Sequence, residues 1–266
     1  MPSPKELFDA GDLAGAIEAV TKEVKAKPTD PGPRTFLFEL LLFSGDLDRS
    51  EKQMEVLGTQ GTEAQLGVMV FRNCLKAERD REKLFTKALA PKFLTEPPHY
   101  VDAHVEAIKR TLEGNFAEAR ELLDKAEEAR PSFPGTLNGV PFDDFRDYDD
   151  FLGPVFEVFV NDQYCWVSIE QVVKLKVSPP KKLRDLYWAT ASIESRDGSK
   201  GDVMLPCLYP RTATHADAEV RLGRMTAWHE LAADVLQGRG SKTYLVGEEE
   251  HTLPELLDLT FGEPGT

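Results

Sequence analysis

The sequence predicts an α+β multidomain protein, in which an α-helical repeat domain over residues 1–134 precedes a smaller mixed α+β domain over residues 135–266. Three observations predict this division. A pattern of glycine, Asp or Asn, and an apolar residue recurs in the first part. Short β-branched and aromatic runs separated by turn residues fill the second part. Between them lies the Pro- and Gly-rich stretch Pro131–Pro141 (PSFPGTLNGVP), which is typical of a boundary.

The recurring pattern begins at three glycines: GDLAGAIEAVTKEVKAKP at Gly11, GDLDRSEKQMEVL at Gly45 and GNFAEARELLDKAEEARP at Gly114. Gly11 and Gly45 are 34 residues apart, which is the period of the helix–turn–helix tetratricopeptide repeat (TPR). The same phase predicts a further start near residue 79, where AERDREKLF has no glycine. We therefore expect TPR-like helical hairpins, whose stacking builds a concave surface for a peptide or a helix.

Local signals agree with helices in this first part. Ser3 and Glu6 have the spacing of a capping box, and Asn115 with Glu118 repeats that spacing. Apolar residues follow at helical spacing, and we expect these stripes to form the core between stacked helices. One such stripe is Leu13, Ile17, Val20 and Val24.

The second part contains two predicted hairpins. PVFEVFV (Pro154–Val160) and QYCWVSI are joined by two residues, Asn161 and Asp162, and such a short polar link between apolar runs is typical of a hairpin. LYWATASI and GDVMLPCLYP flank a turn at Arg196-Asp197-Gly198 and predict a second hairpin.

Further elements of the second part are expected from shorter signals. Ser168 with Gln171 has capping spacing, which favours a short helix through Val172, Val173 and Leu175. SKTYLVG, which begins at Ser241, suggests a last strand, and Thr252 with Glu255 predicts the cap of a closing helix.

The composition narrows the classes of partner. The chain has 32 Lys and Arg against 46 Asp and Glu, a formal net charge of −14, and shows no basic stripe, so we expect no nucleic-acid partner. The apolar run Phe36–Phe43 is far shorter than the ~20 residues that span a bilayer, and we expect no membrane partner. The N-terminus has no signal-peptide pattern, and three scattered cysteines fit free thiols in a reducing compartment. We expect a cytoplasmic protein.

Motifs for catalysis or cofactors are absent from the sequence. It contains no phosphate-binding G-x-x-x-x-G-K-[ST], no G-x-S-x-G, and no pair of histidines at zinc-binding spacing, so we expect no cofactor and no metal. One dense group of charges stands out in FDDFRDYDDFLGP, where five aspartates surround Arg146. These are Asp143, Asp144, Asp147, Asp149 and Asp150.

Two interpretations of this group remain open. In the first, the carboxylates form a structural network with Arg146, or with Arg184, Arg221 and Arg224 elsewhere in the domain. In the second, the protein is a hydrolase-like enzyme that uses segment 143–150, with Asp147, Asp149 or Asp150 as acid–base groups.

Basic residues also recur near tryptophans, in LRDLYW (Leu183–Trp188) and RLGRMTAW (Arg221–Trp228), which suggests cation–π stacking, buried ion pairs or a docking patch. An oligomeric scaffold that self-associates through tryptophans is a third possibility; the oligomeric state does not follow from the sequence. The candidate residues for a structural network or for protein docking are Arg146, Asp147, Asp149, Asp150, Trp166, Arg184, Asp185, Trp188, Arg221, Arg224 and Trp228.

Five segments in order carry a resemblance to a known family: FRDYDDFLGPVFEV, QYCWV, PPKKLRDLYWATA, GDVMLPCLYP and RLGRMTAW. Together they resemble the ImpE/SciE family, also called TagJ, whose members are accessory proteins of bacterial type VI secretion systems. The resemblance extends over nearly the whole chain, because that family also joins a helical N-terminal part to an α+β part. Three positions depart from the family's usual residues: Phe151, Ser168 and Ala227.

The resemblance implies a non-enzymatic cytoplasmic adaptor without a cofactor. Members of the family are associated with the contractile sheath, a virulence-related apparatus, and bind the small sheath subunit (TssB/VipA type) through its N-terminal helix. They are thereby linked to sheath handling by the ClpV-type ATPase. The predicted helical hairpins are compatible with this role, because they supply a groove into which a helix can dock.

Overall fold

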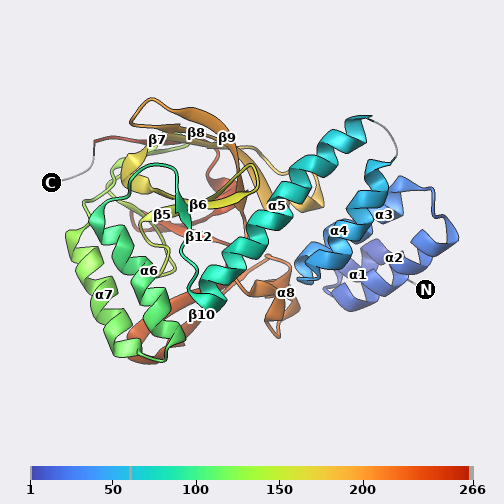
Figure 1. Ribbon diagram of the computed structural model, residues 1–266, viewed down its shortest axis with the longest axis horizontal. Helices are drawn as coiled ribbons and strands as arrows, with labels where there is room; N and C mark the ends of the chain where they lie inside the picture. The colour runs from blue at the N-terminus through green and yellow to red at the C-terminus, as the bar shows by residue number, and fades with distance from the viewer. Residues whose placement is uncertain (1, 60–61, 264–266) are drawn as a thin grey trace.

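The computed structural model describes residues 2–59 and 62–263 and shows a helical N-terminal half and a sheet-rich C-terminal half (Figure 1). Helices α1–α4 lie at one end of the molecule, helices α6 and α7 cover the sheet at the other end, and the long helix α5 runs between them (Figure 1). None of the described helices combines the length and the apolar composition needed to cross a membrane. The elements of the first half are α1 (Pro4–Asp9), α2 (Leu13–Ala26), α3 (Pro31–Phe43), α4 (Leu47–Gly58), α5 (Thr62–Lys87), β1 (Lys92–Phe93), α6 (His99–Leu112) and α7 (Phe116–Ala129).

The same tight turn joins the helices of three hairpins, α1/α2, α3/α4 and α6/α7. A glycine in the left-handed region follows the first helix of each: Gly11 (φ +82°), Gly45 (φ +74°) and Gly114 (φ +83°). The residue after the glycine donates its N–H to the carbonyl five residues earlier, and this bond closes the end of the first helix as in a Schellman motif. The same residue stands at the N-cap of the second helix. These residues are Asp12, Asp46 and Asn115. The recurring sequence pattern is therefore a recurring turn.

The capping predictions are partly confirmed. Ser3 and Glu6 form the reciprocal capping box at the start of α1. Asn115 stands at the N-cap of α7 but makes no side-chain capping bond, so the expected box with Glu118 does not form.

The prediction of a further repeat start near residue 79 is wrong. Helix α5 is continuous from Thr62 to Lys87, so residue 79 lies inside it. The physical reason is visible in the segment AERDREKLF, which lacks the glycine that the left-handed position of the turn requires. The 34-residue period therefore holds only between the first two hairpins.

The main sheet has nine strands in the order β1-β6-β5-β9-β8-β7-β14-β2-β3. A smaller three-stranded sheet, β13-β12-β4, and a hairpin, β10-β11, complete the second half. The strands of the second half are β2 (Gly135–Leu137), β3 (Val140–Phe142), β4 (Phe145–Asp147), β5 (Val155–Val160), β6 (Gln163–Ser168), β7 (Val172–Val177), β8 (Trp188–Ser195), β9 (Lys200–Pro206), β10 (Thr226–Leu231), β11 (Val235–Gly240), β12 (Thr243–Val246), β13 (Glu249–Thr252) and β14 (Leu259–Phe261).

Both predicted hairpins are confirmed. Strands β5 and β6 pair antiparallel up to Val160 and Gln163, with Asn161 in the left-handed conformation at the two-residue turn. Strands β8 and β9 pair antiparallel up to Glu194 and Lys200 around the predicted turn.

Two predicted helices of this half are wrong. Residues Ile169–Gln171 form only one 3₁₀ turn, and Val172–Val177 (VVKLKV) is strand β7, because β-branched residues that alternate with lysines fit a sheet with one covered face. The capping box of Thr252 and Glu255 does form, but it caps a 3₁₀ turn, Leu253–Glu255, that leads into β14. The predicted last strand, β12, is therefore followed by two more strands.

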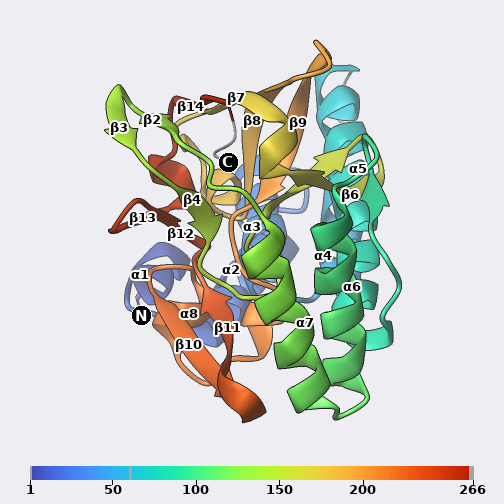
Figure 2. The ribbon, with the colours of Figure 1, turned by 90° about the vertical axis from the view of Figure 1, so that its left-hand side faces the viewer.

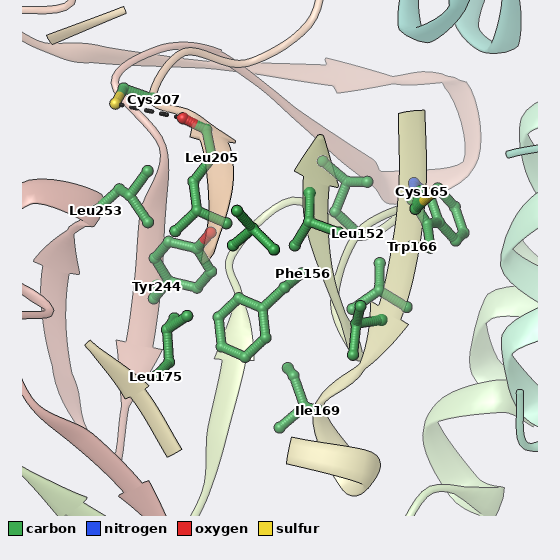
Figure 3. Packing of buried hydrophobic residues seen from close by; sticks show 14 of the residues in the cluster. Leu152, Phe156, Cys165, Trp166, Ile169, Leu175, Leu205, Cys207, Tyr244 and Leu253 are labelled. Atoms are coloured by element: carbon green, nitrogen blue, oxygen red, sulfur yellow. Dashed lines mark hydrogen bonds between the residues drawn. The ribbon is translucent and has the colours of Figure 1, made fainter. Parts of the chain in front are cut away.

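The main core crosses the expected boundary at residue 135. One cluster of buried side chains joins residues of α3–α7 to residues of the sheets. Figure 3 shows its centre, where Phe156 of β5, Leu175 of β7 and Tyr244 of β12 converge. Strand β1 also belongs to the main sheet, where it pairs in parallel with β6. A second cluster joins α1–α3 to Leu208 and Leu222. The secondary structure changes near residue 135, but the hydrophobic packing is shared, and the division into two domains stays a prediction.

Candidate functional site

The last part of the Asp-rich segment, from Asp147 onward, lies inside the protein at the end of β4, whereas Asp143 is exposed. Asp147 and Asp149 are 0% and 1% exposed. Asp149 accepts N–H bonds from Phe151 (2.9 Å) and Gly238 (2.8 Å) through its two carboxylate oxygens. Asp150 accepts from Arg120 (3.0 Å) and Arg146 (3.1 Å), so this carboxylate is shared between two guanidinium groups.

Asp147 is part of a buried network of charges, which we call the buried charge network: Arg81, Glu157, Lys242 and Asp147. Arg81 of α5 donates two hydrogen bonds of 2.8 Å to the carboxylate of Glu157 on β5. Lys242, directly before β12, lies 3.1 Å from Glu157 and 2.7 Å from Asp147. The four side chains are at most 3% exposed, and two tyrosine hydroxyls complete their hydrogen bonding, with Tyr164 donating to Glu157 and Tyr209 to Asp147.

The charges of this network are mutually compensated. Burial acts to raise the pKa of Glu157, but Arg81 and Lys242 outweigh it and lower that pKa to about 2. Burial acts to lower the pKa of Lys242, and Asp147 with Glu157 raises it well above its usual value. Asp149, beside the network, behaves differently, because burial and the negative charge of Asp147 raise its pKa to about 7. The carboxylate of Glu157 and the ammonium group of Lys242 are therefore both charged at neutral pH, whereas the pKa of Asp149 lies near neutrality.

The buried charge network fastens α5 to both sheets. Arg81 also donates to the carbonyl oxygen of Leu208 (2.8 Å), which follows β9. Arg81 also pairs with Glu78, three residues earlier (3.0 Å), but its other partners are far away in the sequence, and reasoning from the sequence missed Arg81, Glu157 and Lys242. Glu157 carried a usable signal, because it is the acidic residue inside the apolar run of β5.

Of the arginines expected to pair with the Asp-rich segment, Arg146 does so, whereas Arg184, Arg221 and Arg224 do not. Arg184 pairs with Glu39 of α3 (2.9 Å) and lies over the ring of Phe71. Arg221 donates to backbone carbonyls of His215 and Ala216. Arg224 pairs with Glu219 (2.9 Å) and also reaches the carbonyls of Phe8 and Asp9 in α1. Besides the expected Arg146, two further arginines hold the segment: Arg120 of α7 pairs with Asp150, and Arg130, directly after α7, pairs with Asp144.

The three tryptophans do not form one surface patch. Trp166 and Trp188 are 0% and 1% exposed, and their indole N–H groups donate to Tyr164 and Glu78. Trp228 is half-buried and packs edge-on against Tyr148, with ring centroids 4.6 Å apart. Asp185 accepts N–H bonds from Lys181 and Lys182 at the start of a 3₁₀ turn. Of the predicted tryptophans, only Trp228 is placed to contact a partner.

Two cavities flank Arg211, a residue in the left-handed conformation (φ +64°) after β9. The larger, of about 420 Å³, lies between the α3/α4 turn, α5 and residues 206–214. The smaller, of about 260 Å³, lies between the ends of α5, α6 and α7 and the β10–β11 hairpin. Over the described ranges, no three His, Cys, Asp or Glu side chains are grouped so that they could hold a metal ion.

An exposed apolar stripe follows the first half of α5. Leu66, Met69 and Val70 are 61%, 57% and 44% exposed and stand at i, i+3 and i+4, on one face of the helix. The opposite face, with Val68 and Phe71, packs against the core. Large apolar side chains in such a row mark a surface that another helix can cover.

Comparisons with known proteins agree with the motifs in the sequence. Residues 139–260 match the ImpE family (ImpE protein). The type VI secretion system accessory component TagJ of Pseudomonas aeruginosa is 32% identical over 257 residues, which cover 97% of this chain and 90% of TagJ. The crystal structure of protein VPA1032 from Vibrio parahaemolyticus superposes with a TM-score of 0.88 at 26% identity, over 97% of both chains. The resemblance is confirmed, and this chain belongs to the ImpE family, together with the type VI secretion accessory component TagJ.

Proposed function

We propose that this protein is a non-enzymatic, cytoplasmic adaptor of a type VI secretion system that binds the small sheath subunit (TssB/VipA type) through the N-terminal helix of that subunit. The adaptor thereby links the sheath to its handling by the ClpV-type ATPase. The observation that carries the proposal is the 32% identity to TagJ over 97% of the chain, because a match over that length includes every element of the fold.

The apolar stripe of α5 is the surface on which we place the incoming helix. Leu66, Met69 and Val70 form a row that fits the apolar face of an amphipathic helix, with anchors at i, i+3 or i+4, and i+7. The hairpin α3/α4 packs against the other face of α5, where Gly58 approaches Val68. The stripe therefore points away from that hairpin, and its three apolar side chains would hold the partner helix.

The internal position of the Asp-rich segment supports a binding role over a hydrolytic one. A hydrolase needs a carboxylate that a substrate can reach. Asp147 and Asp149 are enclosed by Lys242, Tyr209 and backbone N–H groups. The carboxylates are therefore committed to holding the fold.

The test is a calorimetric titration of the full-length protein with a synthetic peptide of the N-terminal helix of the cognate sheath subunit. We expect saturable binding, and at least tenfold weaker binding for the variant Leu66→Glu with Met69→Glu, since both charges would face the apolar side of the incoming helix. The matched control is Val140→Glu, which places a charge on an equally exposed apolar residue of β3. Binding that is lost in neither variant would place the helix elsewhere, and a flat titration with intact sheath subunit would refute the adaptor proposal.

A further inference from the structure

The smaller cavity beside Arg211 has a mouth with an unusual charge. Two arginines, Arg211 and Arg239, have no carboxylate within salt-bridge distance among the side chains that the structure describes (residues 2–59 and 65–263), although the protein carries a net charge of −14. Arg239 donates only to the carbonyl of Gly238 and to the side-chain oxygen of Gln237. In an acidic protein, two neighbouring guanidinium groups without a carboxylate partner create a marked local excess of positive charge.

The β10–β11 hairpin explains how these groups come together. Residues Ala227 and His229 of β10 stand opposite Arg239 and Gln237 of β11, so these side chains share one face of the hairpin. Gln237 lines the smaller cavity together with Arg211. His229 lies on the same face, and its ring is 5.4 Å from that of His215. Figure 2 shows this hairpin beside the lower ends of α6 and α7.

The electrostatics agree with this proximity. Burial lowers the pKa of the Arg239 guanidinium, and the positive charge of Arg211 lowers it further, against a smaller opposing effect of Asp149. Burial, Arg239 and His215 together lower the pKa of His229. Arg211 at the cavity and Arg239, which is hydrogen-bonded to Gln237 of the cavity wall, thus repel each other, and an anion placed between them would relieve that repulsion.

Much of the cavity wall is apolar and is formed by Ile108, Phe116, Phe151 and Leu231. Besides Arg211 and Gln237, the wall contains Thr111 of α6, whose buried hydroxyl has no hydrogen-bond partner in the structure. A buried hydroxyl without a partner costs free energy, and a ligand group that reaches it would recover that cost.

We propose that this cavity is a docking site for an acidic peptide segment of a partner protein, with one apolar side chain in the cavity and neighbouring carboxylates held by Arg211 and Arg239. The volume of about 260 Å³ is below the ~300–1,000 Å³ of small-molecule pockets, and it suits a single anchor side chain. The planar guanidinium forks match carboxylates at the rim. An apolar group next to an anion is what an acidic peptide supplies and what a free phosphate ion lacks.

This site is distinct from the helix-docking stripe. Phe85, at the cavity, is 19 residues from Leu66, at the stripe, and the rise of an α-helix places them about 28 Å apart along α5. The proposal therefore holds or fails independently of the proposed binding of the sheath helix.

The experiment uses the full-length protein and three acetylated, amidated pentapeptides: Glu-Glu-Leu-Glu-Glu, its analogue with glutamine for glutamate, and its analogue with alanine for leucine. Binding is followed by the backbone amide NMR signals of Thr111 and Gln237. We expect saturable shifts with the first peptide and at least fivefold weaker binding of both analogues. Inorganic phosphate is titrated as a fourth probe.

The variants separate the site from the general charge of the protein. Arg211→Gln and Arg239→Gln are each expected to weaken the first peptide at least fivefold. Lys200→Gln removes the same charge from exposed β9 and should change binding less than twofold. Thermal unfolding checks that the Arg239→Gln variant is folded. If that variant is unfolded, the test relies on Arg211→Gln, which changes an exposed side chain. Equal binding of the glutamine analogue, an equal loss in Lys200→Gln, or saturation by phosphate without the peptide would overturn the proposal.

Discussion

Two of the junctions between the helices of the first half and the sheets differ in chemistry. Helix α5 is held by the buried charge network, in which Arg81 and Lys242 neutralise Glu157 and Asp147. Helix α6 is held by His104, which is 3% exposed and whose Nδ1 donates to the carbonyls of Asp150 (3.1 Å) and Phe151 (3.2 Å). The first junction depends on full charges, and the second on a neutral ring.

The difference teaches how each junction responds to change. Burial lowers the pKa of His104 to about 4, so the ring is neutral when the protein is folded at neutral pH. The pKa of Glu157 at the α5 junction is lowered to about 2, so this carboxylate stays ionised between pH 7 and pH 4, where His104 would begin to take up a proton. We expect the α5 junction to tolerate changes of pH and to fail when one partner is removed, and the α6 junction to show the opposite behaviour.

The largest expected effect comes from removing one charge at the α5 junction. Glu157→Gln keeps the shape of the side chain but leaves Arg81 and Lys242 with too little negative charge. Breaking a buried ion pair in this way costs about 3–5 kcal/mol of the free energy of unfolding. Urea denaturation measures it, and a loss below about 1 kcal/mol would show that the network is solvated.

The double variant Arg81→Met with Glu157→Gln sharpens the same test. Because it removes one charge of each sign, it should recover part of the lost free energy of unfolding. The matched control is Lys22→Met, which breaks an ion pair with Glu18 that is 71% exposed on both sides, and it should leave stability unchanged.

The shared turn allows a second comparison, between α3/α4 and α6/α7. Gly45→Ala and Gly114→Ala both place a Cβ in the left-handed region, which costs about 1–2 kcal/mol. The new Cβ at Gly45 would also lie 2.9 Å from that of Ala213, whereas at Gly114 it meets nothing within 4 Å. We expect Gly45→Ala to lose about 1 kcal/mol more in chemical denaturation. Equal losses would mean that residues 206–214 move aside freely.

The third prediction concerns pH at the α6 junction. His104 has a lower pKa folded than unfolded, so the unfolded chain binds a proton first as the pH falls below about 6.5. The contribution of His104 is complete above that pH, decreases as the pH falls toward 4, and amounts to a loss of roughly 2 kcal/mol at pH 5. Comparing urea midpoints at pH 7.5 and 5 for wild type and His104→Gln isolates it. An unchanged pH dependence in the variant would contradict the assignment.

The smallest effect is expected at a third contact between the halves. Arg224, after α8 (Ala218–Arg221), donates to the carbonyls of Phe8 and Asp9 at the end of α1 and lies 5.1 Å from the centroid of the Phe8 ring. Arg224→Met should lower the free energy of unfolding by only about 1 kcal/mol. The loss is small because water can replace the guanidinium as the hydrogen-bond donor to the two carbonyls. Hydrogen exchange of α1 amides checks it: faster exchange confined to α1 is expected, and faster exchange throughout the sheet would contradict a local role.

Local chemistry made part of this structure predictable. The three Gly-Asp/Asn turns, the capping box of Ser3 and the hairpins at Asn161 and Gly198 each depend on residues within a few positions of one another. The same reasoning failed where a capping signal led into a strand. Ser168 and Thr252 both precede a single 3₁₀ turn, and the strand that follows is decided by pairing with distant strands.

The candidate site was less predictable, because its contacts join distant residues. Arg81 and Glu157 are 76 residues apart, and Asp147 and Lys242 are 95 apart. The aspartates of the dense segment and their neighbour Arg146 were recognised from the sequence. The distant arginines proposed as alternatives pair elsewhere, and the partners Arg120 and Arg130, on and directly after α7, were missed. Only the packing of α5 and α7 against the sheets decides which cation reaches which carboxylate.

The length of α5 has a mechanical consequence. The stripe residue Leu66 and the anchored Arg81 belong to one unbroken helix and are about 22 Å apart by the helical rise. A force applied at the stripe is therefore transmitted along the rigid helix to Arg81 and to its buried ion pair with Glu157. A partner that pulls on the stripe would therefore strain the attachment of α5 to the sheet before it bends the helix.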